Sequence, residues 1–185
     1  MNYEAVLRRR VKWLTWVFII GLVISGATAI PLESELDLLA KFLGVADKSS
    51  GEATSGLAHW ILRVREALQE TGVKYPFLAY GTDWLAFGHF VIAVAFIGAL
   101  RDPVRNVWLF TFGMIACALI VPYAFFFGAL RGIPIYWRLI DCSFGVIGII
   151  PVWYCRRCVR EIELVRQGSF PTAPRKEVKA SQTKC

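Results

Sequence analysis

Ionisable side chains within long apolar stretches are the residues of this chain best placed to do chemistry. Four of them lie inside or at the edge of such stretches: Asp83, His89, Arg138 and Asp141. Ionisable groups at membrane depth are costly and suggest a functional site by default. Helical rise places the four at similar depths. We therefore expect one polar pocket near the outer face, in which Arg138 pairs with Asp141 one turn along its helix.

A purely structural role for the same residues is the alternative. Arg138 and Asp141 would then only neutralise each other, while Asp83 would cap the N-terminus of its helix. For His89 we expect a hydrogen bond between helices, since His59 is the only other histidine and the paired haem ligands of a di-haem cytochrome are absent. No group of residues has the spacing of a zinc site. The sequence therefore predicts neither a metal nor a cofactor.

Cys155 and Cys158 form a C-x-x-C motif at the edge of the last apolar stretch. The intervening Arg156 and Arg157 would favour the thiolate form, so a redox or metal role has to be considered. No second cysteine pair and no thioredoxin-like context accompanies the motif. Ordinary thiols, or positions for palmitoylation, are the simpler interpretation.

Motifs of soluble enzymes are missing from the sequence. It contains no G-x-S-x-G, P-loop, H-E-x-x-H or dinucleotide-binding motif. The favoured function is a small non-enzymatic membrane protein, an accessory or scaffold subunit that packs against a protein partner or a second copy. The alternative is a membrane enzyme or transporter that uses the polar pocket.

Four apolar stretches must position these residues. Hydrophobic residues make up 56% of the 185 residues, above the usual level of soluble domains. The stretches cover about residues 13–29, 83–100, 107–130 and 135–154, each of a length that can cross a bilayer. They predict an all-α integral membrane protein with four transmembrane helices in an antiparallel bundle. A cleaved signal peptide is the alternative for the first stretch, because basic residues precede it and Ala27-Thr28-Ala29 resembles a cleavage site.

The domain organisation follows from these spans. Residues 1–168 form the transmembrane domain, residues 31–81 are an external insert, and residues 169–185 are predicted to be a disordered cytoplasmic tail. Leucines at helical spacing and a later apolar stripe predict two amphipathic helices in the insert. Ser34 and Asp37 form a capping pair for the first, and Gly44 ends it.

Basic residues predict the orientation. Clusters near residues 8–12, 101–105 and 156–160 fall on one side of a four-span protein, which should be the cytoplasmic side of a cell membrane. Both termini would then be cytoplasmic. Four arginines on this side are candidates for contact with lipid or a partner: Arg101, Arg105, Arg156 and Arg157. Because the bases cluster beside apolar stretches, the net charge of +7 indicates the bilayer as a partner and not nucleic acid.

Small residues predict which faces of the helices pack closely. In the first stretch they are Gly21, Ser25 and Thr28. In the third they are Gly113, Cys117, Ala124 and Gly128. In the fourth, Gly145 and Gly148 continue the stripe of Arg138 and Asp141, so this stripe should face other helices.

Three segments carry a resemblance to known sequences: Asp83–His89 (DWLAFGH), Arg101–Asn106 (RDPVRN) and Trp137–Gly145 (WRLIDCSFG). Through them the chain resembles a family of small, uncharacterised bacterial four-helix membrane proteins. The likeness covers the second to fourth spans only. It implies a bacterial inner-membrane location and no particular activity.

Overall fold

Helices make up the architecture of the described chain. The computed structural model describes residues 3–52 and 56–168, and no strand occurs among them. Four helices are long and apolar enough to span a membrane: α1 (Tyr3–Ala29), α4 (Tyr80–Arg101), α5 (Val107–Leu130) and α6 (Ile135–Arg166). The predicted tail, residues 169–185, lies outside the described residues.

The helix bounds follow the apolar stretches, with extensions of α6 and α1. α5 has the predicted bounds, and α6 continues through the basic segment to Arg166. α1 begins at Tyr3, ten residues before the apolar stretch, because arginine and lysine are good helix formers. Glu4 accepts a hydrogen bond of 2.8 Å from Arg8 one turn later, which supports this added segment.

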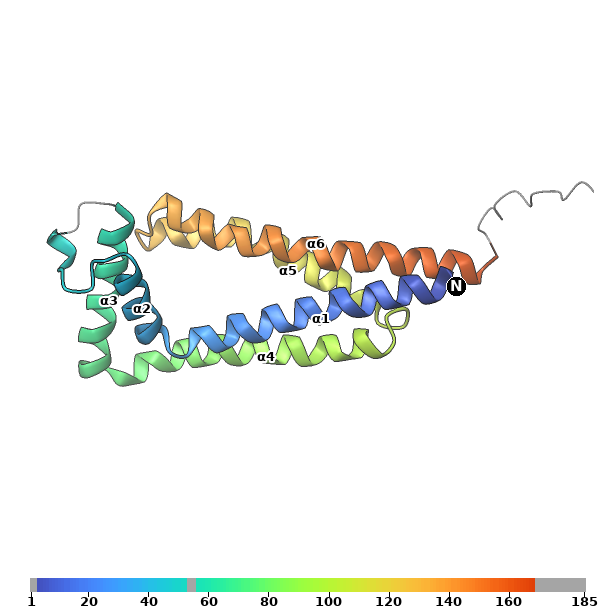
Figure 1. The fold of residues 1–185 in the computed structure, drawn as a ribbon, viewed down its shortest axis with the longest axis horizontal. Helices are drawn as coiled ribbons and strands as arrows, with labels where there is room; N and C mark the ends of the chain where they lie inside the picture. Colours follow the sequence, from blue (N-terminus) through green and yellow to red (C-terminus); the bar gives the residue numbers. More distant parts are fainter. Residues whose placement is uncertain (1–2, 53–55, 169–185) are drawn as a thin grey trace, which may run out of the picture.

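The four long helices form two pairs that meet at one end of the molecule (Figure 1). α1 packs against α4 and α6, α6 packs against α5, and α4 also touches α5, whereas the backbones of α4 and α6 do not lie side by side along the described residues. We call the end where α1 begins and α6 ends the basic end. The other end, where α2 (Leu32–Phe42) and α3 (Gly56–Lys74) cross the bundle, is the capped end.

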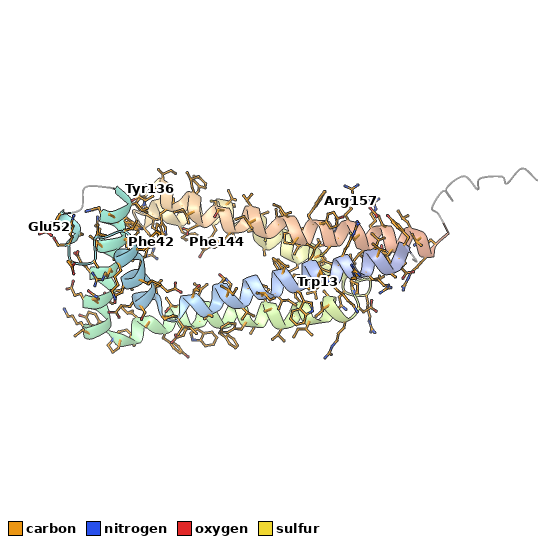
Figure 2. The ribbon with its side chains drawn as sticks, viewed as in Figure 1. Trp13, Phe42, Glu52, Tyr136, Phe144 and Arg157 are labelled. Atoms are coloured by element: carbon orange, nitrogen blue, oxygen red, sulfur yellow. The ribbon has the colours of Figure 1, made fainter. Side chains whose placement is uncertain are left out.

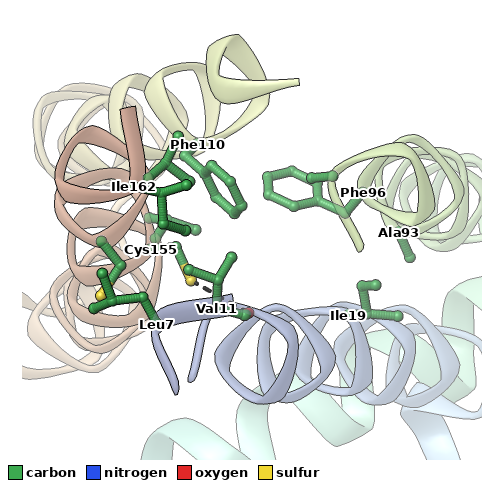
Figure 3. Packing of buried hydrophobic residues seen from close by; sticks show 12 residues of the cluster. Leu7, Val11, Ile19, Ala93, Phe96, Phe110, Cys155 and Ile162 are labelled. Atoms are coloured by element: carbon green, nitrogen blue, oxygen red, sulfur yellow. Dashed lines mark hydrogen bonds between the residues drawn. The ribbon is translucent and has the colours of Figure 1, made fainter. Parts of the chain in front are cut away.

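The main core lies towards the basic end and joins all four helices (Figure 3). Leu7 and Val11 of α1 face Cys155 and Ile162 of α6 there. Phe96 of α4 connects this core to α1 and α5. Its ring centroid lies 4.8 Å from that of Phe18 on α1 and 6.2 Å from that of Phe110 on α5. The two helix pairs are therefore held together mainly by this cluster.

α2 and α3 form a second, smaller core at the capped end. Leu36 and Ala40 of α2 are buried against Ile61 and Leu62 of α3. Arg65 adds a polar link, since its guanidinium forms an ion pair with Asp37 and donates a hydrogen bond of 2.9 Å to the carbonyl oxygen of Ala46. The amphipathic faces predicted for the insert thus pack against each other.

The ends of α2 follow the predicted glycine but not the predicted cap. Gly44 has a φ of +66°, and the amide of Val45 donates to the carbonyl oxygen of Ala40, which closes the C-terminus. The capping pair Ser34 and Asp37 is wrong, because α2 already begins at Leu32, after Pro31. Proline fixes a backbone angle that suits a helix start, and Pro31 takes the N-cap position three residues before Ser34.

Glu66 ties the connection between α2 and α3 to the second core. Its two carboxylate oxygens accept hydrogen bonds of 2.7 Å from the hydroxyl and the amide of Ser50. These bonds favour the charged carboxylate, so the pKa of Glu66 lies below its usual range. Nδ1 of His59 lies 2.7 Å from the carbonyl oxygen of Ser50. Ser50 is therefore fixed to α3 through its amide, its hydroxyl and its carbonyl oxygen.

The cap also reaches the second helix pair. Trp137 of α6 packs against the α2–α3 core, and the hydroxyl of Tyr136 donates a hydrogen bond of 2.7 Å to the carbonyl oxygen of Gly56. At the capped end the two pairs are thus connected through α2 and α3.

Candidate functional site

The four ionisable residues expected to share one pocket do not meet in the structure. Asp83 and His89 lie on α4, and Arg138 and Asp141 lie on α6, two helices that are not direct neighbours along the described residues. α1 packs against both of them, and α5, the partner of α6, also touches α4. The prediction that the four side chains share one pocket is therefore wrong, because two of them lie on each helix pair.

Close approach at small residues explains this choice of neighbours. A Cβ atom on Gly26 of α1 would lie 3.0 Å from the carbonyl oxygen of Ala86, so α1 and α4 touch backbone to backbone there. A Cβ on Gly145 of α6 would lie 2.5 Å from the carbonyl oxygen of Cys117 on α5. The predicted inward stripe of α6 is correct in this respect, but it faces α5 and not α4.

Asp83 is exposed within the first turn of α4. We expected Asp83 to be the N-cap residue of this helix, but the helix already begins at Tyr80. Its side chain lines a hollow of about 230 Å³ beside Tyr80, Trp84 and Phe87. The ring of Trp84 lies edge to face with its two neighbours. Its centroid is 5.9 Å from that of Tyr80 and 5.4 Å from that of Phe87. Asp83 therefore sits among aromatic side chains of its own helix.

His89 lies at the contact between α1 and α4. Its Nδ1 is 2.8 Å from the carbonyl oxygen of Leu85, one turn earlier in the same helix, so the expected hydrogen bond between helices is replaced by a local one. Its Cβ would lie 3.0 Å from a Cβ on Gly26. The ring is half-buried there.

Arg138 packs across the end of α5 and does not pair with Asp141. Its Nε donates a hydrogen bond of 2.7 Å to the carbonyl oxygen of Ile133, and its side chain covers Gly128. Within the described residues, Asp141 forms no ion pair and no side-chain hydrogen bond. The predicted pair is wrong because the carbonyl oxygen in the α5–α6 turn is closer to the guanidinium than the carboxylate is.

Asp141 instead lines a cavity of about 460 Å³ between α5 and α6, near the capped end. The other charged group of its wall is Arg131, which follows the last turn of α5. The remaining wall is mostly apolar: Ala116, Leu119, Ile120, Tyr123, Ala124, Phe127, Gly128 and Ile133. This cavity is the candidate functional site, because an acid and a base face a space that suits an apolar molecule.

The cavity contains residues that our sequence reasoning missed. Tyr123, Phe127 and Arg131 recur at spacings of four residues, which places them along one face of α5 and its end. That spacing was visible in the sequence.

The C-x-x-C motif is part of the core and faces α1. Cys155 and Cys158 are both buried, with 1% and 3% of their surface exposed. The sulfur of Cys155 lies 3.8 Å from the hydroxyl of Thr15 and 3.7 Å from the carbonyl oxygen of Val11. In the described structure neither thiol is accessible to a redox partner or a palmitoyl group, which fits the simpler interpretation of ordinary thiols.

The candidate contact arginines all lie at the basic end. Arg101 closes α4, and Arg105 lies in the turn that follows, where its amide donates a hydrogen bond of 3.2 Å to the carboxylate of Asp102. Nε of Arg156 donates a hydrogen bond of 2.9 Å to the hydroxyl of Thr111 on α5. Arg157 lies beside Trp153, with its guanidinium carbon 5.8 Å from the centre of the indole ring.

Comparison with known proteins adds no relative. The sequence matches no protein-family model, and neither a curated protein nor a solved structure matches it significantly. The evidence about function therefore comes from the geometry of the helices and their side chains.

Proposed function

We propose that this chain is a small non-enzymatic subunit of the cell membrane, with four antiparallel spans, that packs against a transmembrane helix of another protein. Four long apolar helices support insertion. Their lengths agree with a bilayer, since Trp84 to Arg101 of α4 rises by roughly 26 Å at about 1.5 Å per residue. The exposed tryptophans Trp13 and Trp108 lie towards the basic end, where an aromatic belt is expected.

We also propose that the basic end is cytoplasmic, so that both termini lie inside the cell. The support is the excess of arginine and lysine at this end. In intact cells, a single cysteine at Ser50 should react with a membrane-impermeant maleimide, and one at Gln167 should react only after lysis. The background for both is a variant in which the native cysteines are replaced. Equal labelling of the two positions in intact cells would contradict this topology.

The proposal of a protein partner rests on the separation of the two helix pairs. The contacts between α1 and α6 run from Tyr3, whose hydroxyl donates a hydrogen bond to Glu161, to Phe18, which lies beside Gly148. Beyond this level the pairs diverge towards the capped end (Figure 1). In a bilayer every span gains dispersion energy from close packing, so apolar side chains that stay exposed on the diverging helices favour a further helix against them.

Phe144 lies where such a helix would pack. It is 62% exposed, and its side chain points from α6 towards the side on which α1 lies (Figure 2). The neighbouring helices expose further apolar residues, such as Ile20 and Ile24 of α1. A transmembrane helix of a partner or of a second copy would bury these side chains between both pairs.

Photo-crosslinking tests the subunit proposal. Benzoylphenylalanine at Phe144 should crosslink to a protein in native membranes. The same amino acid at Phe126 should not, although this α5 residue is 61% exposed and thus equally accessible. Crosslinks from both positions alike, or from Phe144 to lipid alone, would contradict the proposal.

A second candidate function comes from the α5–α6 cavity. Asp141 faces it without a partner among the described residues, as a group that binds or transfers protons would. A membrane enzyme or transporter built around this carboxylate would act as a monodisperse chain. Absence of a protein crosslink from Phe144 would therefore favour this alternative.

A further inference from the structure

A second charged hollow lies on α6 at the basic end, away from the α5–α6 cavity. It has a volume of about 590 Å³ and begins at Trp153, close to where the apolar part of the helix ends. Three arginines and two glutamates line it: Arg156, Arg157, Arg160, Glu161 and Glu163. Tryptophan at this position is typical of the membrane–water interface. The charges therefore stand at the level of lipid headgroups and just beyond it.

Two of these charges are already used within the protein. Nε of Arg157 lies 3.7 Å from the carboxylate of Glu161, and its guanidinium lies against the ring of Trp153. The other carboxylate oxygen of Glu161 accepts a hydrogen bond of 3.0 Å from the hydroxyl of Tyr3. Arg157 and Glu161 thus form a fixed wall of the hollow.

The remaining three charges are open to a ligand. Arg156 uses Nε to bind Thr111, which orients its guanidinium while the terminal nitrogens stay exposed. Arg160 and Glu163 form no side-chain hydrogen bond or ion pair within the described residues, although both line the hollow. Two guanidinium groups and one carboxylate are therefore available together.

The order of these charges along α6 matches one type of lipid headgroup. Moving away from the apolar segment, the aromatic Trp153 comes first, then the two arginines, and Glu163 comes last. Arg160 and Glu163 are about 4.5 Å apart along the helix axis, at about 1.5 Å per residue. In a phosphoethanolamine headgroup the phosphate is likewise attached on the side of the acyl chains, and a two-carbon linker of similar length separates it from the ammonium group.

We infer that this hollow binds the headgroup of an ethanolamine phospholipid. Arg156 and Arg160 bind the phosphate by charge-assisted hydrogen bonds, and Glu163 accepts a hydrogen bond from the ammonium group. The inference rests on the proposed membrane insertion, but it does not require the proposed protein partner.

This geometry separates ethanolamine from related headgroups. Choline carries the same charge, but its trimethylated nitrogen has no N–H to donate to Glu163. A glycerol headgroup offers the same phosphate to the arginines and places no positive charge beside Glu163. Wild-type protein should therefore prefer ethanolamine lipid by at least roughly tenfold, the lower end of the effect of one charge-assisted hydrogen bond.

Lipid retention tests the inference. The chain is reconstituted into phosphatidylcholine vesicles with equal minor amounts of phosphatidylethanolamine and phosphatidylglycerol, then extracted in mild detergent. Retained lipids are quantified by mass spectrometry. Glu163→Gln should remove the preference for ethanolamine over glycerol lipid, while Arg160→Gln should lower retention of both. Arg63→Gln is the matched control, because this exposed arginine of α3 lies at the capped end and should leave retention unchanged.

Several outcomes would overturn the site. One is that the wild type retains the three lipids in proportion to their shares in the vesicles. Another is that Arg63→Gln lowers lipid retention as much as Arg160→Gln does. Soluble phosphoethanolamine should compete poorly; if it displaced the lipid at equal concentration, the site would be for a free phosphate compound. Flotation of the chain with the vesicles measures insertion separately, so failure of the headgroup site is distinguishable from failure of the membrane assignment.

Discussion

Replacing Gly145 by alanine is expected to destabilise the α5–α6 pair by about 1–3 kcal/mol, the usual cost of overpacking. The added Cβ would lie 2.5 Å from the carbonyl oxygen of Cys117 and 3.2 Å from the Cβ of Ile120. The first of these is a backbone atom, which cannot rotate away, so the helices must separate. Unfolding of the purified protein by dodecyl sulfate in mixed micelles measures the change.

Gly21→Ala is the matched control for this prediction. Gly21 lies in another long helix, α1, and a Cβ added there meets no atom within 4 Å. Because alanine is the better helix former, this variant should be neutral or slightly more stable. A loss of stability as large as that of Gly145→Ala would show that the α5–α6 contact is not the cause.

Phe96→Ala is the second variant with a large expected effect, a loss of about 2–3 kcal/mol. Phe96 is completely buried, and its ring packs between Phe18 of α1 and Phe110 of α5. Lipid is as apolar as this core, so the loss comes from the cavity and the missing dispersion contacts and is smaller than in a soluble protein. The same unfolding assay measures it.

Phe87→Ala separates this effect from the removal of a ring in general. Phe87 lies on the same helix and is exposed, and its ring contacts the ring of Trp84. Its removal should cost at most about 1 kcal/mol, the contribution of one aromatic pair. If both variants lost the same stability, Phe96 would not be the residue that joins the helix pairs.

The lengths of the helices were predictable because they depend on local composition. The third apolar stretch, residues 107–130, became α5 without change. Gly44 ends α2 as expected, since its positive φ is a property of the residue type. The predicted close-packing face of α5 was also correct at Gly113, Cys117 and Gly128, which are all buried.

Which helices pack against each other, and through which faces, was not predictable in the same way. On α1 the small-residue face expected at Gly21 and Thr28 is exposed, and the close approach occurs at Gly26. Small residues are frequent in membrane helices, so their spacing gives several candidate faces of similar quality. Only the shape of the partner, here Ala86 and Phe90 of α4, selects among them.

The candidate site shows where sequence reasoning stops. Residue type and position singled out Asp141 as a group worth locating, because charge within an apolar stretch is unusual. The sequence by itself determined four apolar helices, their approximate lengths and the concentration of basic residues at one end, all properties of neighbouring residues. Tertiary structure alone decided that α1 lies between α4 and α6, that Arg138 binds the carbonyl of Ile133, and that Asp141 faces a cavity instead. These outcomes depend on ångström-scale steric fit between distant segments, to which hydrophobic periodicity is insensitive.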